Sequence, residues 1–206
     1  MVNKMIKGVV FDMGGVLTVD NFDAVLKKVA LDFGVPYEEL SLLRKKHHAN
    51  LTLGKYSIRQ FVESLKQGFS LKLSVDELME IWKKHYTGET PFIKDTFELS
   101  RKLKGKYSVG ILSNLYDFHT QIMSERGLYK GFVPCIVSNQ VGLAKPDSAI
   151  YKLYLKKAKL KAEDCVFIDD KEEFIFAAQK LGFKTILYKN HVQCVSELQA
   201  FEVELK

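Results

Sequence analysis

Six polar side chains of this chain stand where apolar stretches stop or a helical pattern starts, and their types suit the handling of phosphate. They are Asp12 after the run 8–11, Ser113 and Asn114 after the run 106–112, Lys145 in a loop before a helical pattern, and Asp169 and Asp170 after the run 165–168. In an open α/β sheet the carboxyl ends of the strands and the loops beside them gather the reactive groups. The set therefore predicts one site made from distant parts of the chain.

Each of these residues also has a purely structural explanation. Asp12 could be a solvated strand terminus, and Ser113 could cap the helix that follows it. Lys145 could be an ordinary surface lysine. The pair Asp169-Asp170 could cap the next helix, so the order and spacing of the whole set must decide.

In this order and spacing the segments resemble the four motifs of the haloacid dehalogenase superfamily, specifically its phosphatase-like branch with a helical cap inserted after the first strand. The resemblance covers nearly the whole chain through residues 11–17, 111–114, 141–147 and 167–170, followed by Ala177-Ala178 and Leu181-Gly182. It implies an α/β fold with a doubly wound parallel sheet, a Rossmann-like core whose first strand is central, and an inserted helical cap domain.

The resemblance also implies a mechanism and a role for each residue. Asp12 would attack phosphorus and form an aspartyl phosphate. Mg²⁺ would be held by Asp12, the backbone carbonyl of Gly14 and Asp170, with Asp169 either ligating or holding a metal-bound water. Two adjacent acids beside a third repel one another without a cation, which favours metal binding. The substrate phosphate would be bound by the Ser113 hydroxyl, the Asn114 backbone N–H and the Lys145 ammonium.

The chain departs from the family pattern at Gly14. Most phosphatases of this superfamily carry a second Asp there, which protonates the leaving oxygen and then activates water. The loss of such a group costs about 10²–10⁴-fold in rate. Four residues could replace it, although a structural role is expected for each: Asp20, Lys171, His47 and His48. Lys171 and Phe174 are lesser departures, and Phe174 is expected to face the core.

Three functions remain open. The first is an Mg²⁺-dependent phosphatase acting on a small phosphorylated metabolite, weakened by Gly14 and biased toward good leaving groups. The second is a catalytically silent protein that binds a phosphorylated ligand or a partner protein. The third is a 2-haloacid dehalogenase, a branch that uses no metal and lacks the acidic pair seen here at Asp169 and Asp170.

The pattern of apolar residues predicts the elements that position this site. Residues 1–18 and 91–206 are expected to form the core, and 19–90 a cap of helices without strands. In the cap, helices are predicted over 21–33 and from 36 to about 48, and the capping-box pairs Ser57/Gln60 and Ser74/Glu77 begin two more. In the core we expect a helix from Pro91 to Gly105, strands at 106–112, 133–138, 165–169 and 183–188, and helices at 117–126, 148–160, 172–181 and 195–203.

Composition sets the remaining expectations. The chain has 206 residues, 47% of them hydrophobic, which is enough for a substantial core. The excess of 31 basic over 25 acidic residues is spread over helical faces, so no nucleic-acid partner is expected, though the positive charge favours encounter with anionic substrates. No membrane span or signal is evident, which predicts a cytoplasmic protein. Cys135, Cys165 and Cys194 are expected to be free thiols, and the oligomeric state is left open.

Overall fold

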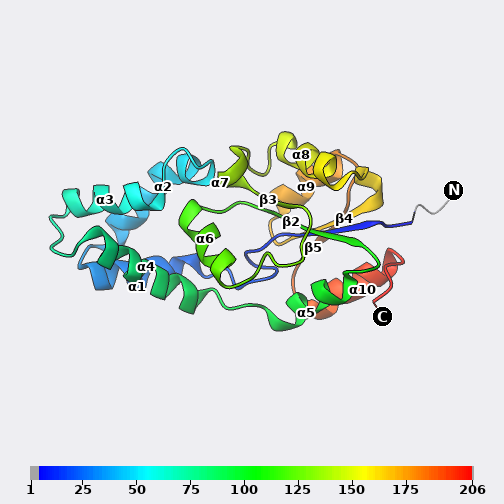
Figure 1. Ribbon diagram of the computed structural model, residues 1–206, viewed down its shortest axis with the longest axis horizontal. Helices are drawn as coiled ribbons and strands as arrows, with labels where there is room; N and C mark the ends of the chain where they lie inside the picture. The colour runs from blue at the N-terminus through cyan, green and yellow to red at the C-terminus, as the bar shows by residue number, and fades with distance from the viewer. Residues whose placement is uncertain (1–4, 206) are drawn as a thin grey trace.

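The computed structural model describes residues 5–205, in which four helices follow the first strand and strands then alternate with helices (Figure 1). The strands are β1 (Gly8–Phe11), β2 (Ser108–Ser113), β3 (Cys135–Val137), β4 (Cys165–Asp169) and β5 (Lys184–Leu187). The first four helices are α1 (Phe22–Phe33), α2 (Tyr37–Thr52), α3 (Ile58–Gly68) and α4 (Val75–Glu89). The others are α5 (Lys94–Leu103), α6 (Asp117–Glu125), α7 (Ser138–Val141), α8 (Ser148–Ala158), α9 (Glu172–Lys180) and α10 (His191–Ala200), with a 3-10 turn at Ala162–Asp164.

The strands form one parallel sheet in the order β3-β2-β1-β4-β5. This is the doubly wound α/β fold expected from the sequence, with β1 at its centre. The order of the strands reverses at β1, because the chain builds outward first to the β2 side and then to the β4 side. Such a switch point opens a crevice at the carboxyl ends of the strands.

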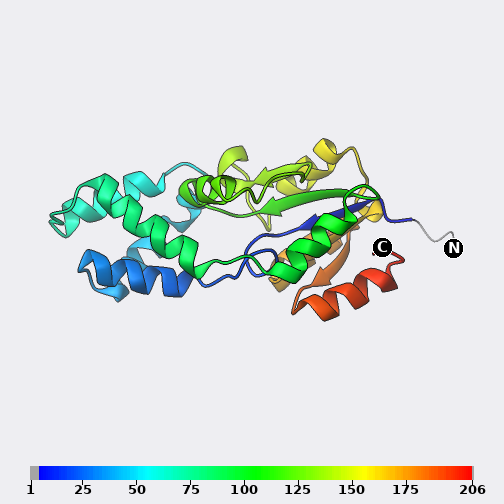
Figure 2. The same cartoon turned by 60° about the horizontal axis from the view of Figure 1, so that its bottom comes forward.

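Both faces of the sheet are covered, which explains why β1 is apolar throughout. Val10 packs with residues of α8 and α9 on one face. Val9 and Phe11 point the other way and pack with residues of α5, α6 and α10. Figure 2 shows α5 and α10 on one side of the sheet and α8 on the other.

Helices α1–α4 form a bundle at one end of the molecule, beyond the carboxyl edge of the sheet (Figure 1). Both predicted capping boxes are present, at Ser57 and Ser74, and they begin α3 and α4. Trp82 of α4 is fully buried against Phe61 of α3. Between Phe22 and Glu89 the structure contains helices and no strand, as the periodicity predicts.

Two short connections, residues 18–21 and 90–93, join this helical bundle to the sheet. They run side by side, because the Val19 N–H donates to the Pro91 carbonyl at 2.9 Å and the Ile93 N–H donates to the Leu17 carbonyl at 2.9 Å. Thr18 and Phe92 also form an antiparallel bridge. The expected start of a helix at Pro91 is therefore wrong: α5 begins at Lys94, after this paired segment.

Other boundaries also differ from the prediction. The last helix starts at His191 rather than near 195, because the Asn190 side chain accepts the Gln193 N–H and caps the helix earlier. The first core helix ends at Leu103, before Gly105, and the short helix α7 was not predicted. These shifts leave the order of the large elements unchanged.

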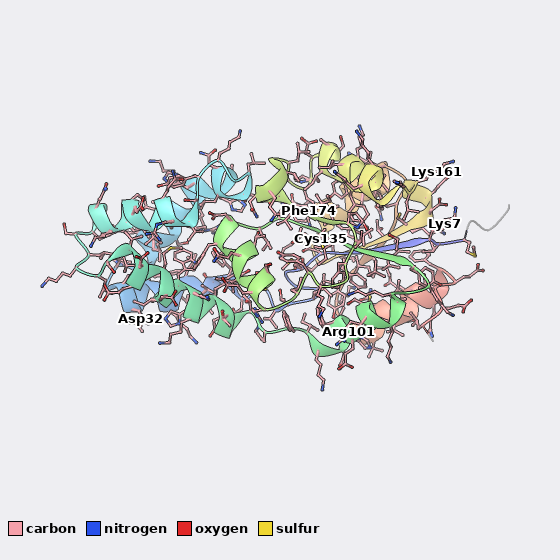
Figure 3. All side chains as sticks on the ribbon, viewed as in Figure 1. Lys7, Asp32, Arg101, Cys135, Lys161 and Phe174 are labelled. Atoms are coloured by element: carbon pink, nitrogen blue, oxygen red, sulfur yellow. The ribbon has the colours of Figure 1, made fainter. Side chains whose placement is uncertain are left out.

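The surface and the cysteines agree with the composition. Charged side chains are spread over the whole molecule: Lys7 and Lys161 lie toward the end farthest from the bundle, and Asp32 lies on the bundle (Figure 3). All three cysteines are free thiols. Within residues 5–205 no helix is long and apolar enough to cross a membrane.

Candidate active site

The strand register brings the predicted carboxylates together. Phe11 of β1 aligns with Ile168 of β4, so the next residues, Asp12 and Asp169, stand side by side at the carboxyl edge. Asp170 follows directly. One carboxylate oxygen from each of Asp12, Asp169 and Asp170 lies within 4.8 Å of the others. We call these three residues the carboxylate cluster.

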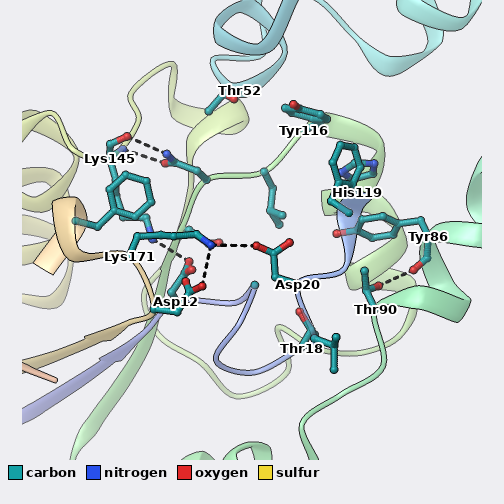
Figure 4. Close-up of a pocket in the computed structure, with 18 of the residues that line it drawn as sticks. Asp12, Thr18, Asp20, Thr52, Tyr86, Thr90, Tyr116, His119, Lys145 and Lys171 are labelled. Atoms are coloured by element: carbon teal, nitrogen blue, oxygen red, sulfur yellow. Dashed lines mark hydrogen bonds and ion pairs between the residues drawn. The ribbon is translucent and has the colours of Figure 1, made fainter. Parts of the chain in front are cut away.

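Lys145 reaches into the carboxylate cluster from the loop before α8 (Figure 4). Its Nζ lies 2.9 Å from Asp12 Oδ1 and 2.5 Å from Asp169 Oδ2, and its side chain is fully buried. Burial disfavours the ammonium, but the charges of Asp12 and Asp169 outweigh burial and raise the pKa of Lys145. The lysine is therefore a fixed positive charge beside Asp12.

Asp169 is fully engaged by the protein. Its Oδ2 accepts from Lys145, and its Oδ1 accepts the Lys171 backbone N–H at 2.9 Å. Burial raises the pKa of Asp169, and the nearby Lys145 opposes that rise. These contacts make Asp169 a residue that orients Lys145 and the turn after β4.

Asp170 differs because part of its carboxylate is left bare. Its Oδ2 is paired with Lys171 at 2.9 Å, whereas its Oδ1 is buried without a hydrogen-bond partner among residues 5–205. Burial raises the pKa of Asp170, and Lys171 counteracts this only in part. A buried bare carboxylate oxygen is costly unless a cation or donor reaches it.

The donor set fits a hard divalent cation. Mg²⁺ prefers oxygen ligands and keeps several waters, so a few protein oxygens suffice. Asp12 and the bare Oδ1 of Asp170 offer such oxygens, and Gly14 lines the same pocket. The carboxylate cluster is therefore suited to a magnesium ion.

Lys171 pairs with a second acid, Asp20, across the mouth of the site. Its Nζ lies 3.3 Å from Asp20 Oδ2 as well as 2.9 Å from Asp170 Oδ2. Hydrogen bonding to Asp170 and the two negative charges raise the pKa of Lys171. Lys171 thus links the turn after β4 to the connection that precedes α1 (Figure 4).

Asn114 holds the lysine loop in place. Its Nδ2 donates to the Lys145 carbonyl at 2.9 Å, and its Oδ1 accepts the Lys145 backbone N–H at 2.9 Å. Ser113, at the end of β2, is a buried residue that is 1% exposed, and no residue of 5–205 hydrogen-bonds its hydroxyl. Ser113 can therefore donate to a ligand, while the Asn114 side chain is already used.

The two glycines after Asp12 serve different purposes. Gly15 has φ +77°, and a Cβ on it would lie 2.5 Å from Asp170 Oδ2, so only glycine lets the turn approach that carboxylate. Gly14 lies outside the left-handed region, and a Cβ there would meet only Asp20, at 3.8 Å. Position 14 could therefore accept a side chain.

A pocket of about 260 Å³ lies over this edge and extends to the helical bundle. Three residues on one face of α2, spaced four apart, line it: Arg44, His48 and Thr52, the α2 face. Arg44 has no acidic partner among residues 5–205, and the buried Thr52 hydroxyl has no hydrogen-bond partner there. The remaining wall is largely apolar and aromatic and includes Val19, Phe22, Tyr86, Leu115, Tyr116, His119 and Phe174.

His119 is the centre of this aromatic wall. Its ring stacks on Tyr86 at 3.9 Å between centroids, and its Nε2 accepts a hydrogen bond from Trp82 Nε1 at 3.0 Å. Burial lowers the pKa of His119 to about 3. The ring is therefore neutral and fixes α6 against α4.

Three of the four residues that could replace a carboxyl group at position 14 line the pocket, and the fourth does not. Asp20, Lys171 and His48 line the pocket, whereas His47 packs against Tyr56 and does not. Phe174 packs against the core, as expected, and its ring also lines the pocket, with its centroid 4.7 Å from Lys145 Nζ.

Sequence reasoning missed most of the pocket wall. Phe22, Tyr86 and His119 come from three helices, and no local motif marks them. The four-residue spacing of Arg44, His48 and Thr52 was the one available signal. It could be interpreted only once the orientation of α2 was known.

The comparisons with known proteins agree with this geometry. The family model for haloacid dehalogenase-like hydrolases matches residues 6–182. A D-ribitol-5-phosphate phosphatase of Bacteroides thetaiotaomicron is 27% identical over 94% of this chain and 97% of its own length. The bifunctional epoxide hydrolase 2 of Sus scrofa is 26% identical over 94% of this chain, which spans only 38% of that protein.

A solved structure has the same fold. It is a HAD family enzyme from Bacteroides thetaiotaomicron in complex with magnesium and inorganic phosphate, with a TM-score of 0.76 and 21% identity. The alignment covers 89% of this chain and 94% of that one.

Proposed function

Because the chain belongs to the haloacid dehalogenase-like hydrolases, we propose that it is an Mg²⁺-dependent phosphatase that acts on a small phosphorylated metabolite. Asp12 would be the nucleophile and would carry the phosphoryl group between the two half-reactions. The proposal draws on a relative named as a phosphatase and on a related fold that binds magnesium and phosphate. Residues 19–90 would serve as the cap of the catalytic core 1–18 and 91–206.

The observation that carries this proposal is the bare Asp170 Oδ1 beside Asp12, opposite a lysine whose position is fixed. Asp12, Asp170 and the Gly14 carbonyl would hold the ion, with Asp169 in contact with it or with its water. Bound Mg²⁺ would supply charge to neutralise the transferring phosphoryl group. Phosphoryl transfer depends mainly on such neutralisation and on alignment.

The protein's own donors would complete the phosphate site. The unpartnered Ser113 hydroxyl and the Asn114 backbone N–H would donate to the phosphate oxygens. Lys145, held by Asp12 and Asp169, would place its charge between the nucleophile and the phosphate. Because two carboxylates hold the Lys145 ammonium, this positive charge would already be in position before the phosphate binds.

The pocket wall supports a leaving group that combines a polar end with an apolar body. Arg44 lacks an acidic partner and Thr52 a hydrogen-bond partner, so the α2 face would bind hydroxyls or a second anionic group. The rings of Phe22, Tyr116 and His119 would pack against its carbon skeleton. A volume of about 260 Å³ suits a small metabolite.

A metabolite screen tests this function. Wild-type protein should release inorganic phosphate from members of a phosphorylated-metabolite panel with Mg²⁺, and not with chelator. Asp12→Asn, which keeps size and removes the nucleophile, should release none. Binding of magnesium and a phosphate analogue such as beryllofluoride without turnover would favour the silent binding protein. Chloride release from 2-chloropropionate without metal would favour a dehalogenase.

A further inference from the structure

The space beside Gly14 is filled by another carboxylic acid. A Cβ built on Gly14 would lie 3.8 Å from both Cβ and Cγ of Asp20, and no other residue comes within 4 Å of it. Asp20 therefore occupies the region that a carboxylate at position 14 would enter. We propose that Asp20 is the general acid and base of the phosphoryl transfer, an inference that rests on the proposed phosphatase function.

Asp20 is placed to meet the leaving group. It lines the same pocket as Asp12 and Ser113, on the side toward the bundle (Figure 4). Lys171 holds its Oδ2 at 3.3 Å, while its Oδ1 accepts no hydrogen bond from residues 5–205. One oxygen thus fixes the carboxyl group and the other remains open to the pocket.

The other candidates in the pocket are less suitable. The Lys171 ammonium is paired with both Asp20 and Asp170, so it acts as an anchor for the acid. His48 lies on α2 and shares its Nδ1 with the Tyr116 hydroxyl at 2.7 Å. Of these side chains only that of Asp20 lies within 4 Å of a Cβ built on Gly14, in the turn that follows the nucleophile.

The reaction balances with Asp20 in this role. The Asp20 carboxylate first takes up a proton from solvent. In the first step an Asp12 oxygen bonds to phosphorus, the bond from phosphorus to the leaving oxygen breaks, and the Asp20 carboxylic acid gives that oxygen its proton. In the second step Asp20, now a carboxylate, takes a proton from water as the water oxygen bonds to phosphorus. The bond to Asp12 breaks, phosphate leaves and both acids return to the forms in which they entered the first step.

The position of Asp20 in the chain ties this chemistry to the bundle. Asp20 lies in the connection 18–21, next to Val19, whose N–H donates to the Pro91 carbonyl. The same connection is tied to the turn after Asp12, because the Thr18 N–H donates to the Met13 carbonyl at 2.9 Å and the Gly15 N–H donates to the Thr18 carbonyl at 2.7 Å. Asp20 therefore lies where the turn after the nucleophile and the bundle meet.

Two substrates of similar shape separate proton donation from other effects. Phenyl phosphate has a poor leaving group and 4-nitrophenyl phosphate a good one that needs little protonation. Asp20→Asn should lower kcat/KM for phenyl phosphate by about 10²–10⁴-fold and for 4-nitrophenyl phosphate by no more than about tenfold. Because the second half-reaction also loses its base, 4-nitrophenyl phosphate should give a burst of nitrophenol and a phosphorylated protein detectable by intact mass.

The decisive experiment moves the carboxyl group from position 20 to position 14. In Gly14→Asp/Asp20→Ala the acid enters from position 14, where a Cβ meets nothing closer than 3.8 Å, and the smaller alanine at position 20 vacates the space that the Asp20 carboxyl group fills. This double variant should recover most of the phenyl phosphate activity lost in Asp20→Asn. Asp23→Asn, an exposed acid paired with Lys27 on α1, is the matched control and should keep the wild-type substrate ratio.

The outcomes distinguish this inference from the proposed function. Mg²⁺ titration of Asp20→Asn should give the wild-type affinity, which excludes an indirect effect through Lys171 and Asp170. An unchanged ratio of the two substrates in folded Asp20→Asn, or no recovery in the double variant, overturns the role of Asp20 alone. A wild-type protein that hydrolyses neither ester with Mg²⁺ overturns the phosphatase proposal as well.

Discussion

At the scale of single residues the site is a balance of buried charge. Lys145 pairs its single positive charge with both Asp12 and Asp169, whereas Asp170 shares Lys171 with Asp20 and keeps one oxygen bare. Carboxylates this close repel one another, so the arrangement is stable only with enough positive charge around it. A bound metal ion would add positive charge beside Asp12 and Asp170.

Asp170→Asn should therefore remove Mg²⁺ binding and leave the fold intact. The substitution deletes the bare oxygen's charge and relieves repulsion with Asp12, although it also weakens the pair with Lys171. Isothermal titration calorimetry should show no Mg²⁺ heat, while the unfolding temperature stays at or above the wild-type value. Asp164→Asn, a buried acid that is paired with Lys7, should keep wild-type Mg²⁺ affinity. Retained binding in Asp170→Asn would show that Asp170 is not a ligand.

The turn after β1 gives a second prediction at this scale. Gly15→Ala places a Cβ at φ +77°, 2.5 Å from Asp170 Oδ2, and so must displace that carboxylate. Gly127→Ala has a similar backbone, at φ +75°, with nothing within 4 Å of the new Cβ. Both should lose about 1 kcal/mol of stability, but only Gly15→Ala should weaken Mg²⁺ binding, measured by calorimetry. Equal Mg²⁺ affinities in the two variants would contradict the close approach.

At the scale of elements, the sequence predicted what lies at strand ends and missed what lies between helices. Asp12 and Asp169 each follow an apolar strand, and parallel strands leave no other place for them than one edge. The aromatic wall depends on how α1, α4 and α6 pack, which no local pattern encodes. The start of α5 was misplaced for a similar reason: a tertiary pairing with residues 17–19 overrides the preference of Pro91 for a first helical turn.

The junction between α4 and α6 should make stability depend on pH. Burial lowers the pKa of His119 to about 3, against an ordinary value of 6.5, so only the unfolded chain takes up its proton between these values. The stability that depends on a neutral His119 is fully present above pH 6.5 and is lost as the pH falls from 6.5 toward 3. By pH 5 the free energy of unfolding has fallen by about 2 kcal/mol for this reason, at 1.4 kcal/mol per pH unit. Its ring contacts are with Trp82, Tyr86, Tyr116 and Phe22, and no carboxylate within residues 5–205 forms an ion pair with it to stabilise an imidazolium.

Denaturant unfolding followed by Trp82 fluorescence measures this effect, since Trp82 is the single tryptophan of the chain and donates to the His119 ring. His119→Gln keeps a hydrogen-bond acceptor and does not titrate. The loss of stability from pH 7.5 to pH 5 should be smaller in this variant by about 2 kcal/mol. If both proteins lose the same free energy, protonation of His119 does not control the junction.

At the scale of the whole molecule, the candidate active site lies in a pocket between two bodies, the sheet with its helices and the helical bundle. The sheet carries Asp12 and Lys145, and the helical bundle carries the α2 face. Besides the contacts of His119 with α4, they touch where the Asp117 carboxylate accepts the Ile58 N–H at the start of α3, at 2.9 Å, and where Gly54 packs against α7. The spacing of the two bodies therefore sets how the leaving group is held while the carboxylate cluster stays within the sheet.

Gly54 allows this spacing to be changed without replacing any residue that lines the pocket. A Cβ on Gly54 would overlap the carbonyl oxygen of Asn139 and lie 3.0 Å from its carbonyl carbon, so Gly54→Ala must push the end of α2 away from α7. Thr52 and His48 would move with it. A misplacement of about 1 Å can cost up to about 10²-fold in rate, so kcat/KM for the preferred metabolite should fall by about that factor, while Mg²⁺ affinity stays unchanged. Gly34→Ala is the matched control, because its φ of +70° equals the +69° of Gly54 and nothing lies within 4 Å of its new Cβ. Both variants carry the same backbone strain, so equal kcat/KM values would mean that turnover does not depend on how closely the bundle approaches the sheet.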